Sequence, residues 1–256
     1  MIIAELKGKL SPKVIEMEDV LTSNVFSFFK YTDNSILKEY LKFLIKISVL
    51  DDDDFIIEFW PRFDDQTEPD VVIQSQEYYI VLEAKYKSEL EKSNKNRYDQ
   101  IDREIEGGKI ASKNFNKKFV YILITAKYCE ETNEFELYKK EAEKDLFIFK
   151  WTNWQEVATF LKTKVISEKS LPISAKIFAQ DLYDLLIKKN LITFTSIRDL
   201  ITENTKTLSS LQNTSKCQFF STDGSTYSGK YYGFSKVLQN LPNINKPKGR
   251  IFFDGK

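Results

Sequence analysis

The sequence predicts an α/β fold in which a mixed central β-sheet is flanked by helices. Residues 119–126 form a strongly apolar run, which is typical of a buried central strand. Two shorter apolar runs, 71–73 and 78–82, are separated by a polar stretch that can turn. Apolar residues at helical spacing precede and follow these runs. A chain of 256 residues, 42% of them hydrophobic, can bury a real core, in one large domain or in one domain with an appendage.

The first predicted helix opens at Ser11-Pro12, because serine suits the N-cap and proline the first turn. Glu18 falls within its apolar stripe, so this glutamate needs a polar partner. Two interpretations stay open: Glu18 is a buried, hydrogen-bonded acid, or it is a third acid that faces a functional site. The stripe consists of Val14, Met17, Leu21, Val25 and Phe28.

A second helix is predicted over residues 35–47, where Ile36, Tyr40 and Leu44 follow helical spacing. The acidic run 51–54 looks like a metal cluster, but adjacent residues cannot all face one ion. We therefore expect a solvated loop there. Residues 55–60 form the first strand, which ends at Pro61 because proline cannot donate to a sheet ladder.

The two short apolar runs predict an antiparallel hairpin. Hairpin pairing brings the start of the first strand next to the end of the second, so Asp70 should meet Glu83 and Lys85. Side chains alternate along a strand, so Glu83 and Lys85 share one face and Ala84 lies on the other. Three charged side chains are thus expected to converge at the end of an apolar hairpin.

A helix is predicted over residues 96–106, packed through Tyr98, Ile101 and Ile105 and ended by Gly107-Gly108. Its opposite face carries Gln100, Arg103 and Glu104. The buried strand 119–126 follows, then a strand over 146–151 and a short helix over 153–161.

The sequence divides into a core over residues 1–165 and a C-terminal helical and β extension over residues 166–256. An amphipathic helix is expected at 177–189. The last forty or so residues alternate aromatic residues with glycine and serine, and Asp223-Gly224 is a hairpin signal. This pattern favours a small strand-rich piece at the end of the chain.

Composition excludes several classes of catalyst. The chain has no histidine, which excludes Ser-His-Asp and Cys-His nucleophile systems and histidine-containing zinc sites. Lysine plus arginine and aspartate plus glutamate balance at 38 each, so nucleic acid would have to bind a local patch. Two distant cysteines fit a reducing compartment. With no signal peptide and no long apolar run, we expect a cytoplasmic protein with no membrane partner.

The charges at the hairpin end suit metal-assisted chemistry. Two carboxylates at one point repel each other unless a proton or a cation lies between them. Carboxylate oxygens suit Mg²⁺, with Mn²⁺ as an alternative, and both ions also accept water and phosphate oxygens. A neighbouring lysine can orient an attacking water, help to deprotonate it, or neutralise charge that develops on phosphate. The competing interpretation is an ordinary salt bridge at the edge of a sheet.

The order of helix with an inward glutamate, strand, hairpin with Pro-Asp and Glu-x-Lys, helix and strand resembles the PD-(D/E)xK nuclease superfamily. This superfamily has the restriction-endonuclease-like fold. The resemblance covers roughly residues 11–165. It depends on Asp70 in EPD, on Glu83 and Lys85 in LEAKYK, on Glu18, and on Gln100 in RYDQIDREIEGG. The stretches EFWPRF, FKWTNWQEV and AQDLYDLL are also similar to a bacterial branch with defence or restriction roles.

The resemblance implies a Mg²⁺-dependent endonuclease that acts on phosphodiester bonds, in DNA. Asp70 and Glu83 would ligate the ion, helped by the Ala84 carbonyl, and Glu18 would hold a metal-bound water or a second ion. Lys85 would orient the attacking water, and Gln100 would contact the phosphate backbone. A homodimer or a partner protein could assist recruitment. The alternative is a nuclease-like module without catalysis that binds DNA or a partner protein.

Overall fold

The computed structural model of the chain describes residues 2–45, 54–88, 92–93, 97–130 and 135–193. Its centre is a five-stranded sheet in the order β1-β2-β3-β6-β7. Helices flank this sheet, so the predicted α/β class with a mixed central sheet is confirmed. The strands are β1 (Ile56–Phe59), β2 (Val71–Gln74), β3 (Tyr78–Ala84), β6 (Lys118–Thr125) and β7 (Ile148–Asn153).

The sheet is mixed because it contains both antiparallel and parallel strand pairs. β1, β2 and β3 pair antiparallel, and the predicted hairpin forms with Val71 opposite Leu82. β3, β6 and β7 pair parallel, and each parallel step is spanned by a helix. The carboxyl ends of β3, β6 and β7 therefore lie at one edge of the sheet, where α/β proteins commonly place their sites.

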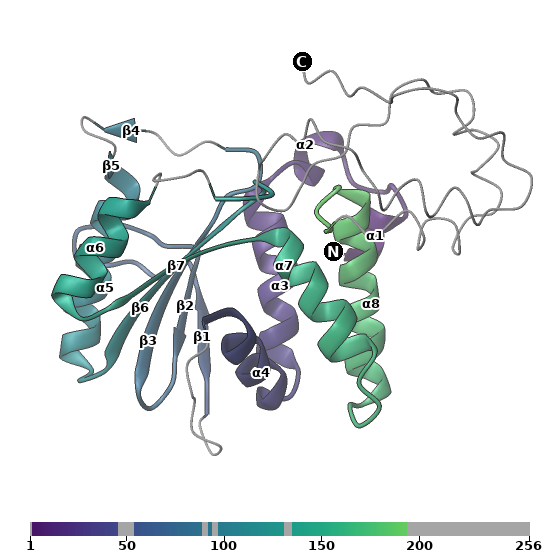
Figure 1. Cartoon of the computed structure of the whole chain (residues 1–256). Helices are drawn as coiled ribbons and strands as arrows, with labels where there is room; N and C mark the ends of the chain where they lie inside the picture. Colours follow the sequence, from purple (N-terminus) through teal and green to yellow (C-terminus); the bar gives the residue numbers. More distant parts are fainter. Residues whose placement is uncertain (1, 46–53, 89–91, 94–96, 131–134, 194–256) are drawn as a thin grey trace, which may run out of the picture. The chain divides into compact units, whose positions relative to one another are not determined.

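Helices cover both faces of the sheet, in the three-layer arrangement of Figure 1. α5 (Asp99–Asn114) and α6 (Glu136–Asp145) pack on one face, against alternate residues such as Val81 and Tyr121. The other face, with Leu82 and Ile122, meets the remaining large helices. These are α3 (Glu18–Tyr31), α4 (Asn34–Ile45), α7 (Trp154–Phe160) and α8 (Ile173–Lys188). Period-two alternation thus buries β3 and β6 on both sides.

The helix predicted from Ser11 is wrong in one respect, because two helices form. α2 (Pro12–Ile15) ends before Glu16, and Met17 is extended, with φ −69° and ψ 129°. Met17 was expected on the packed face but is 43% exposed. The break makes Glu18 the first residue of α3, where a carboxylate interacts favourably with the helix dipole.

The predicted helix end at Gly107-Gly108 is also wrong, because α5 continues to Asn114. Both glycines lie where the helix approaches its neighbours closely. A Cβ added at Gly107 would lie 2.3 Å from the Phe63 ring, and one at Gly108 would lie 2.4 Å from the Phe119 ring. The absence of a side chain serves packing here rather than helix termination.

The C-terminal part of the described chain packs with the core. α7 continues into a π-helical turn, η1 (Leu161–Ile166), and α8 packs against η1, α7, α3 and α1 (Ile2–Leu6). One compact unit spans Met1–Thr193, which extends beyond the boundary that we expected at residue 165. The predicted strand-rich segment after residue 193, and acidic residues 51–53, lie outside the described residues.

Two further features complete the description. β4 (Lys92–Ser93) and β5 (Arg97–Tyr98) form a small antiparallel pair before α5. None of the helices within the described ranges combines the length and apolar character needed to cross a bilayer.

Candidate active site

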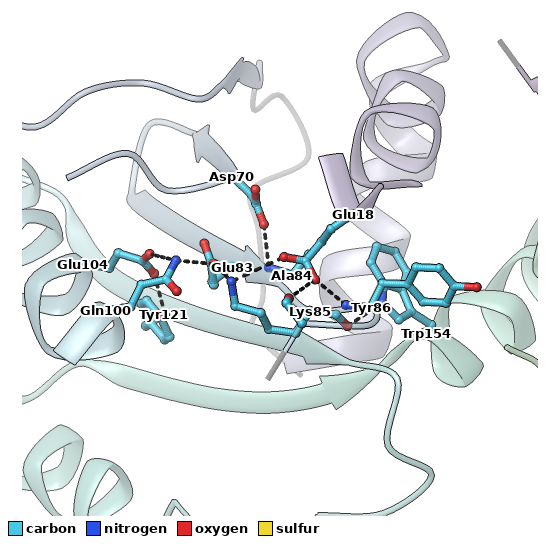
Figure 2. Close-up of polar contacts among 11 residues, drawn as sticks. Glu18, Asp70, Glu83, Ala84, Lys85, Tyr86, Gln100, Glu104, Tyr121 and Trp154 are labelled. Atoms are coloured by element: carbon cyan, nitrogen blue, oxygen red, sulfur yellow. Dashed lines mark hydrogen bonds and ion pairs between the residues drawn. The ribbon is translucent and has the colours of Figure 1, made fainter. Parts of the chain in front are cut away.

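Asp70 and Glu83 lie side by side at the end of the β2–β3 hairpin (Figure 2). The register that pairs Val71 with Leu82 places Asp70 opposite Glu83, so both carboxylates lie on the α5 face of the sheet. The Ala84 N–H donates to Asp70 Oδ2 at 2.9 Å, and the Trp60 N–H donates to the Asp70 carbonyl at 3.0 Å. Asp70 is 8% exposed and Glu83 is 2% exposed. Two carboxylic acids therefore lie close together and are almost completely buried from solvent.

Lys85 joins these acids to Glu18, which comes from the opposite helical layer. Its Nζ lies 2.6 Å from Glu83 Oε1 and 3.4 Å from Glu18 Oε1. Glu18 Oε2 accepts hydrogen bonds from the Tyr86 N–H at 2.6 Å and from Ser88 Oγ at 2.5 Å. Glu18 thus contacts the segment that follows β3 as a hydrogen-bonded acid, with its side chain 17% exposed. Its role as a third acid at a metal site stays a prediction.

The backbone of Lys85 is fixed on both sides. Its N–H donates to the Ile124 carbonyl at 2.7 Å, which extends the β3–β6 ladder by one residue. Its carbonyl accepts a hydrogen bond from the indole Nε1 of buried Trp154 at 3.0 Å. The position of the Lys85 side chain therefore depends on the central strand β6 and on the first residue of α7.

Gln100 reaches the same cluster from α5. Its Nε2 donates to Glu83 Oε1 at 2.5 Å and to Glu104 Oε1 at 2.9 Å. Glu104 Oε2 accepts from the Tyr121 hydroxyl at 2.7 Å. Sequence reasoning placed Glu104 on the face away from the packing residues, which is wrong, because Glu104 is fully buried. The expected contact of Gln100 with phosphate stays a prediction, since its amide nitrogen here serves two carboxylates.

Several carboxyl groups of the cluster are buried close together, and burial raises their pKa values. Burial, followed by the nearby Glu83 charge, raises the pKa of Asp70 to about 8. Burial, followed by the nearby Glu104 charge, raises the pKa of Glu83 to about 8. Burial raises the pKa of Glu104 to about 7, although its hydrogen bonds with Tyr121 and Gln100 act in the opposite direction. Burial alone would lower the pKa of Lys85, but Glu83, Glu18 and Asp70 outweigh it, so the pKa is raised. Lys85 is the charged partner of the cluster.

The oxygen donors of the cluster fit a hard divalent cation. Glu83 Oε2 is buried, and no hydrogen-bond donor within the described residues reaches it. Such an orphaned oxygen, beside a second carboxylate and opposite one lysine, leaves negative charge that a cation can balance. In the described ranges, no three His, Cys, Asp or Glu side chains converge as a ready-made chelate. Mg²⁺ binds through one or two carboxylates and completes its shell with waters and phosphate oxygens.

A polar cavity of about 540 Å³ opens beside the cluster. Lys85, Gln100 and Glu104 belong to its wall, so a molecule that entered it would meet the site directly. The remaining lining residues are Gln66, Thr67, Glu68, Ser88, Asp99 and Arg103. Each of these lining residues is polar or charged, which suits a charged, hydrated ligand better than an apolar one.

Three residues of the site escaped the sequence analysis: Glu104, Tyr121 and Trp154. The spacing of Gln100 and Glu104, four residues apart on one helix, is a signal for a paired contact that could have been used. Tyr121 and Trp154 carried no signal beyond that of ordinary core aromatics. The other acidic candidate, the run at 51–54, contributes only Asp54 to the described residues, and Asp54 is exposed.

No protein-family model, curated protein or solved structure matches this chain.

Proposed function

We propose that this chain is a Mg²⁺-dependent endonuclease of the PD-(D/E)xK type, with a restriction-endonuclease-like core, that hydrolyses phosphodiester bonds in DNA. One observation carries the proposal: Asp70, Glu83 and Lys85 converge at the end of one hairpin, with Glu18 bonded to the segment that follows it. A structural salt bridge would need one acid and one base. Lys85 instead pairs with both Glu83 and Glu18, and the charges of Asp70 and Glu104 lie close to Glu83, so carboxylates outnumber the lysine, which a cation stabilises.

The topology supports the same assignment. A helix that presents Glu18 precedes an antiparallel hairpin, and a helix with Gln100 then crosses to a parallel strand. This is the element order through which the chain resembles the superfamily. The polar cavity beside Lys85 and Gln100 supplies room for a phosphate and its waters.

Asp70 and Glu83 would hold the Mg²⁺ ion, with the Ala84 carbonyl as a further oxygen donor. A bound Mg²⁺ supplies Lewis-acid polarisation of the phosphate and lowers the pKa of water. Glu18 accepts hydrogen bonds from Tyr86 and Ser88, so its carboxylate is fixed where it can also accept one from a water.

Lys85 acts as a fixed positive charge. Its raised pKa keeps the ammonium protonated, so it donates hydrogen bonds to a water or a phosphate oxygen and does not remove a proton. Developing negative charge on the phosphate is stabilised by an ammonium that is already oriented. A lysine that stays protonated can orient the water and neutralise charge on the phosphate, but it cannot act as a general base.

The proposed DNA substrate would have to bind through local contacts rather than through the charge of the whole chain. The net charge is zero, so DNA would be held by local contacts near the cavity, where Arg103 is an exposed cation. The branch resemblance extends the proposal to a cytoplasmic enzyme of bacterial defence or restriction, assisted by a second copy or a partner protein.

The test is incubation of the purified chain with supercoiled plasmid in Mg²⁺, and separately in EDTA. We expect nicked or linear DNA only with Mg²⁺, and none with Lys85→Ala. Lys87→Ala is the matched control, because Lys87 is an exposed lysine two residues away that pairs with Glu16 outside the cluster. If wild-type protein leaves DNA intact but retards it in a gel, the chain is a binding module without catalysis.

A further inference from the structure

A buried ion pair joins the two ends of the described fold. Lys189, directly after α8, places its Nζ 2.6 Å from Glu5 Oε1 in α1. The Lys189 side chain is 3% exposed and the Glu5 side chain is fully buried. Lysine and glutamate are almost never buried to this degree unless they are paired, so both residues need an explanation.

Lys189 makes two more contacts, and both lie next to the candidate site. Its Nζ donates to the Ile15 carbonyl at 2.5 Å, at the end of α2. The same ammonium lies 4.9 Å from the centroid of the Tyr86 ring, which is a cation–π distance. One charged group therefore contacts α1, the end of α2 and the residue that follows Lys85.

These contacts hold both partners of a hydrogen bond inside the site. Ile15 precedes Glu18 by three residues, across the break between α2 and α3. Tyr86 donates its N–H to Glu18 Oε2 at 2.6 Å (Figure 2). Lys189 thus contacts the segment that precedes Glu18 and the ring of Tyr86, whose N–H donates to Glu18.

The placement of Lys189 depends on how α8 ends. Asn190 has φ 57°, the left-handed conformation that asparagine tolerates and that stops a helix. The Leu191 N–H then bonds back to the Leu186 carbonyl at 2.8 Å. The stop at Asn190 leaves Lys189 on the inner side of the last turn, where its side chain reaches inward.

A buried ion pair is a poor source of stability, because desolvation of two charges offsets most of their attraction. Its value lies in specifying one arrangement of the groups around it. We propose that Lys189, held by Glu5, is a positioning residue for the active site: it sets Glu18 and Tyr86 relative to each other and so aligns Lys85. This inference rests on the proposed nuclease function.

The experiment compares three variants of the full chain. Lys189→Met keeps the length of the side chain and removes its charge. Glu5→Gln/Lys189→Met removes both charges, so no unpaired charge stays buried. Lys188→Met is the matched control, because Lys188 donates to the backbone carbonyls of Glu5 and Leu6 but contacts neither Ile15 nor Tyr86.

Each variant is measured for thermal stability, for the kcat and KM of plasmid cleavage, and for amide hydrogen exchange at Tyr86. We expect Lys189→Met to lower kcat by about tenfold or more, as loss of a supporting contact does at metal sites, with KM unchanged. The double variant should recover thermal stability but not kcat, and its Tyr86 amide should exchange faster. Lys188→Met should keep the wild-type kcat and the wild-type exchange at Tyr86.

Two results would overturn the inference. Recovery of both stability and kcat in the double variant would show that the pair serves the fold alone. Unchanged exchange at Tyr86 in the double variant would show that Lys189 does not hold the Glu18–Tyr86 contact. The exchange measurement needs no activity, so it decides the positioning role even where wild-type protein fails to cleave DNA and the proposed function fails.

Discussion

At the scale of single residues, the charge state of Lys85 distinguishes its proposed role in catalysis from the proposed metal binding by Asp70 and Glu83. Lys85 lies within salt-bridge distance of Glu83 and Glu18, and its pKa is raised by them. A lysine that stays charged cannot ligate Mg²⁺, whereas Asp70 and Glu83 offer oxygen to it. Metal binding and catalysis should therefore be separable by substitution.

Asp70→Asn should lose Mg²⁺ binding and cleavage together, and Lys85→Ala should lose cleavage while it still binds Mg²⁺. Asparagine keeps an oxygen that can accept the Ala84 N–H, so Asp70→Asn changes charge more than structure. Calorimetric titration with Mg²⁺ and a plasmid-nicking assay measure the two properties. Asp64→Asn, an exposed aspartate in the preceding loop, is the control. Equal Mg²⁺ affinity in Asp70→Asn and wild type would contradict the assignment.

Glu104→Gln should lower the cleavage rate by about 10- to 100-fold, the usual cost of losing a group that orients a metal ligand. Glu104 accepts hydrogen bonds from both Tyr121 and Gln100, and an amide cannot accept both in the same way. Circular dichroism checks that the variant is folded. Glu106→Gln, an exposed position on the same helix, should retain the wild-type rate. A wild-type rate in Glu104→Gln would make Glu104 a bystander.

At the scale of elements, local pattern predicted the hairpin and the core strands, and failed where distant packing decides. The β2–β3 hairpin and its register follow from two apolar runs and a short turn, so Asp70, Glu83 and Lys85 could be brought together from sequence alone. The burial of Glu104 could not be predicted from sequence, because it depends on Tyr121, which lies 17 residues later in another element. The helix through Gly107 and Gly108 likewise depends on rings that lie elsewhere in the sequence.

Gly108→Ala should destabilise the protein by ~1–3 kcal/mol through overpacking, although helix propensity alone favours alanine by ~1 kcal/mol. The added Cβ would lie 2.4 Å from the ring of Phe119, which is 5% exposed in a central strand and cannot move away. Gly107→Ala should cost less, because Phe63 is only partly buried. Urea unfolding measures both. A Gly108→Ala protein as stable as wild type would show that the α5–sheet contact can adjust.

Glu18→Gln should lower Mg²⁺-dependent cleavage and leave the protein folded. Glu18 begins α3 and accepts hydrogen bonds from Tyr86 and Ser88, so glutamine keeps an acceptor but loses the charge that faces Lys85. Glu16→Gln is the control, since Glu16 is exposed and pairs with Lys87. Unaltered activity in Glu18→Gln, or loss of the fold, would make Glu18 a structural acid.

At the scale of the whole molecule, the site draws on both helical layers. Glu18 comes from α3 on one face of the sheet, and Gln100 and Glu104 come from α5 on the other. α8 completes the first of these layers with Ala179, Leu182, Leu185 and Leu186, all fully buried. A helix pattern does not show which surface the helix covers, so α8 was expected in the C-terminal extension and not in the core.

A chain shortened to residues 1–193 should unfold cooperatively, and one shortened to 1–165 should not fold. Removal of α8 exposes four buried apolar side chains and their partners, and each large one contributes ~1.5–3 kcal/mol. Together these contributions are comparable to the ~5–15 kcal/mol that stabilises a typical domain. Calorimetry of both chains tests this. A cooperative transition in the 1–165 chain would place α8 outside the core.

The contact between Lys189 and the Ile15 carbonyl joins residues 174 positions apart in the sequence. Protein synthesis proceeds from the N-terminus, and Glu18, Asp70 and Lys85 leave the ribosome long before Lys189 does. α8 packs against α1, α3 and α7 within one compact unit, so the fold that brings these groups together is complete only after α8 has emerged. If the chain is the proposed endonuclease, a nascent chain that ends before residue 189 would carry every proposed catalytic group and still lack the aligned site.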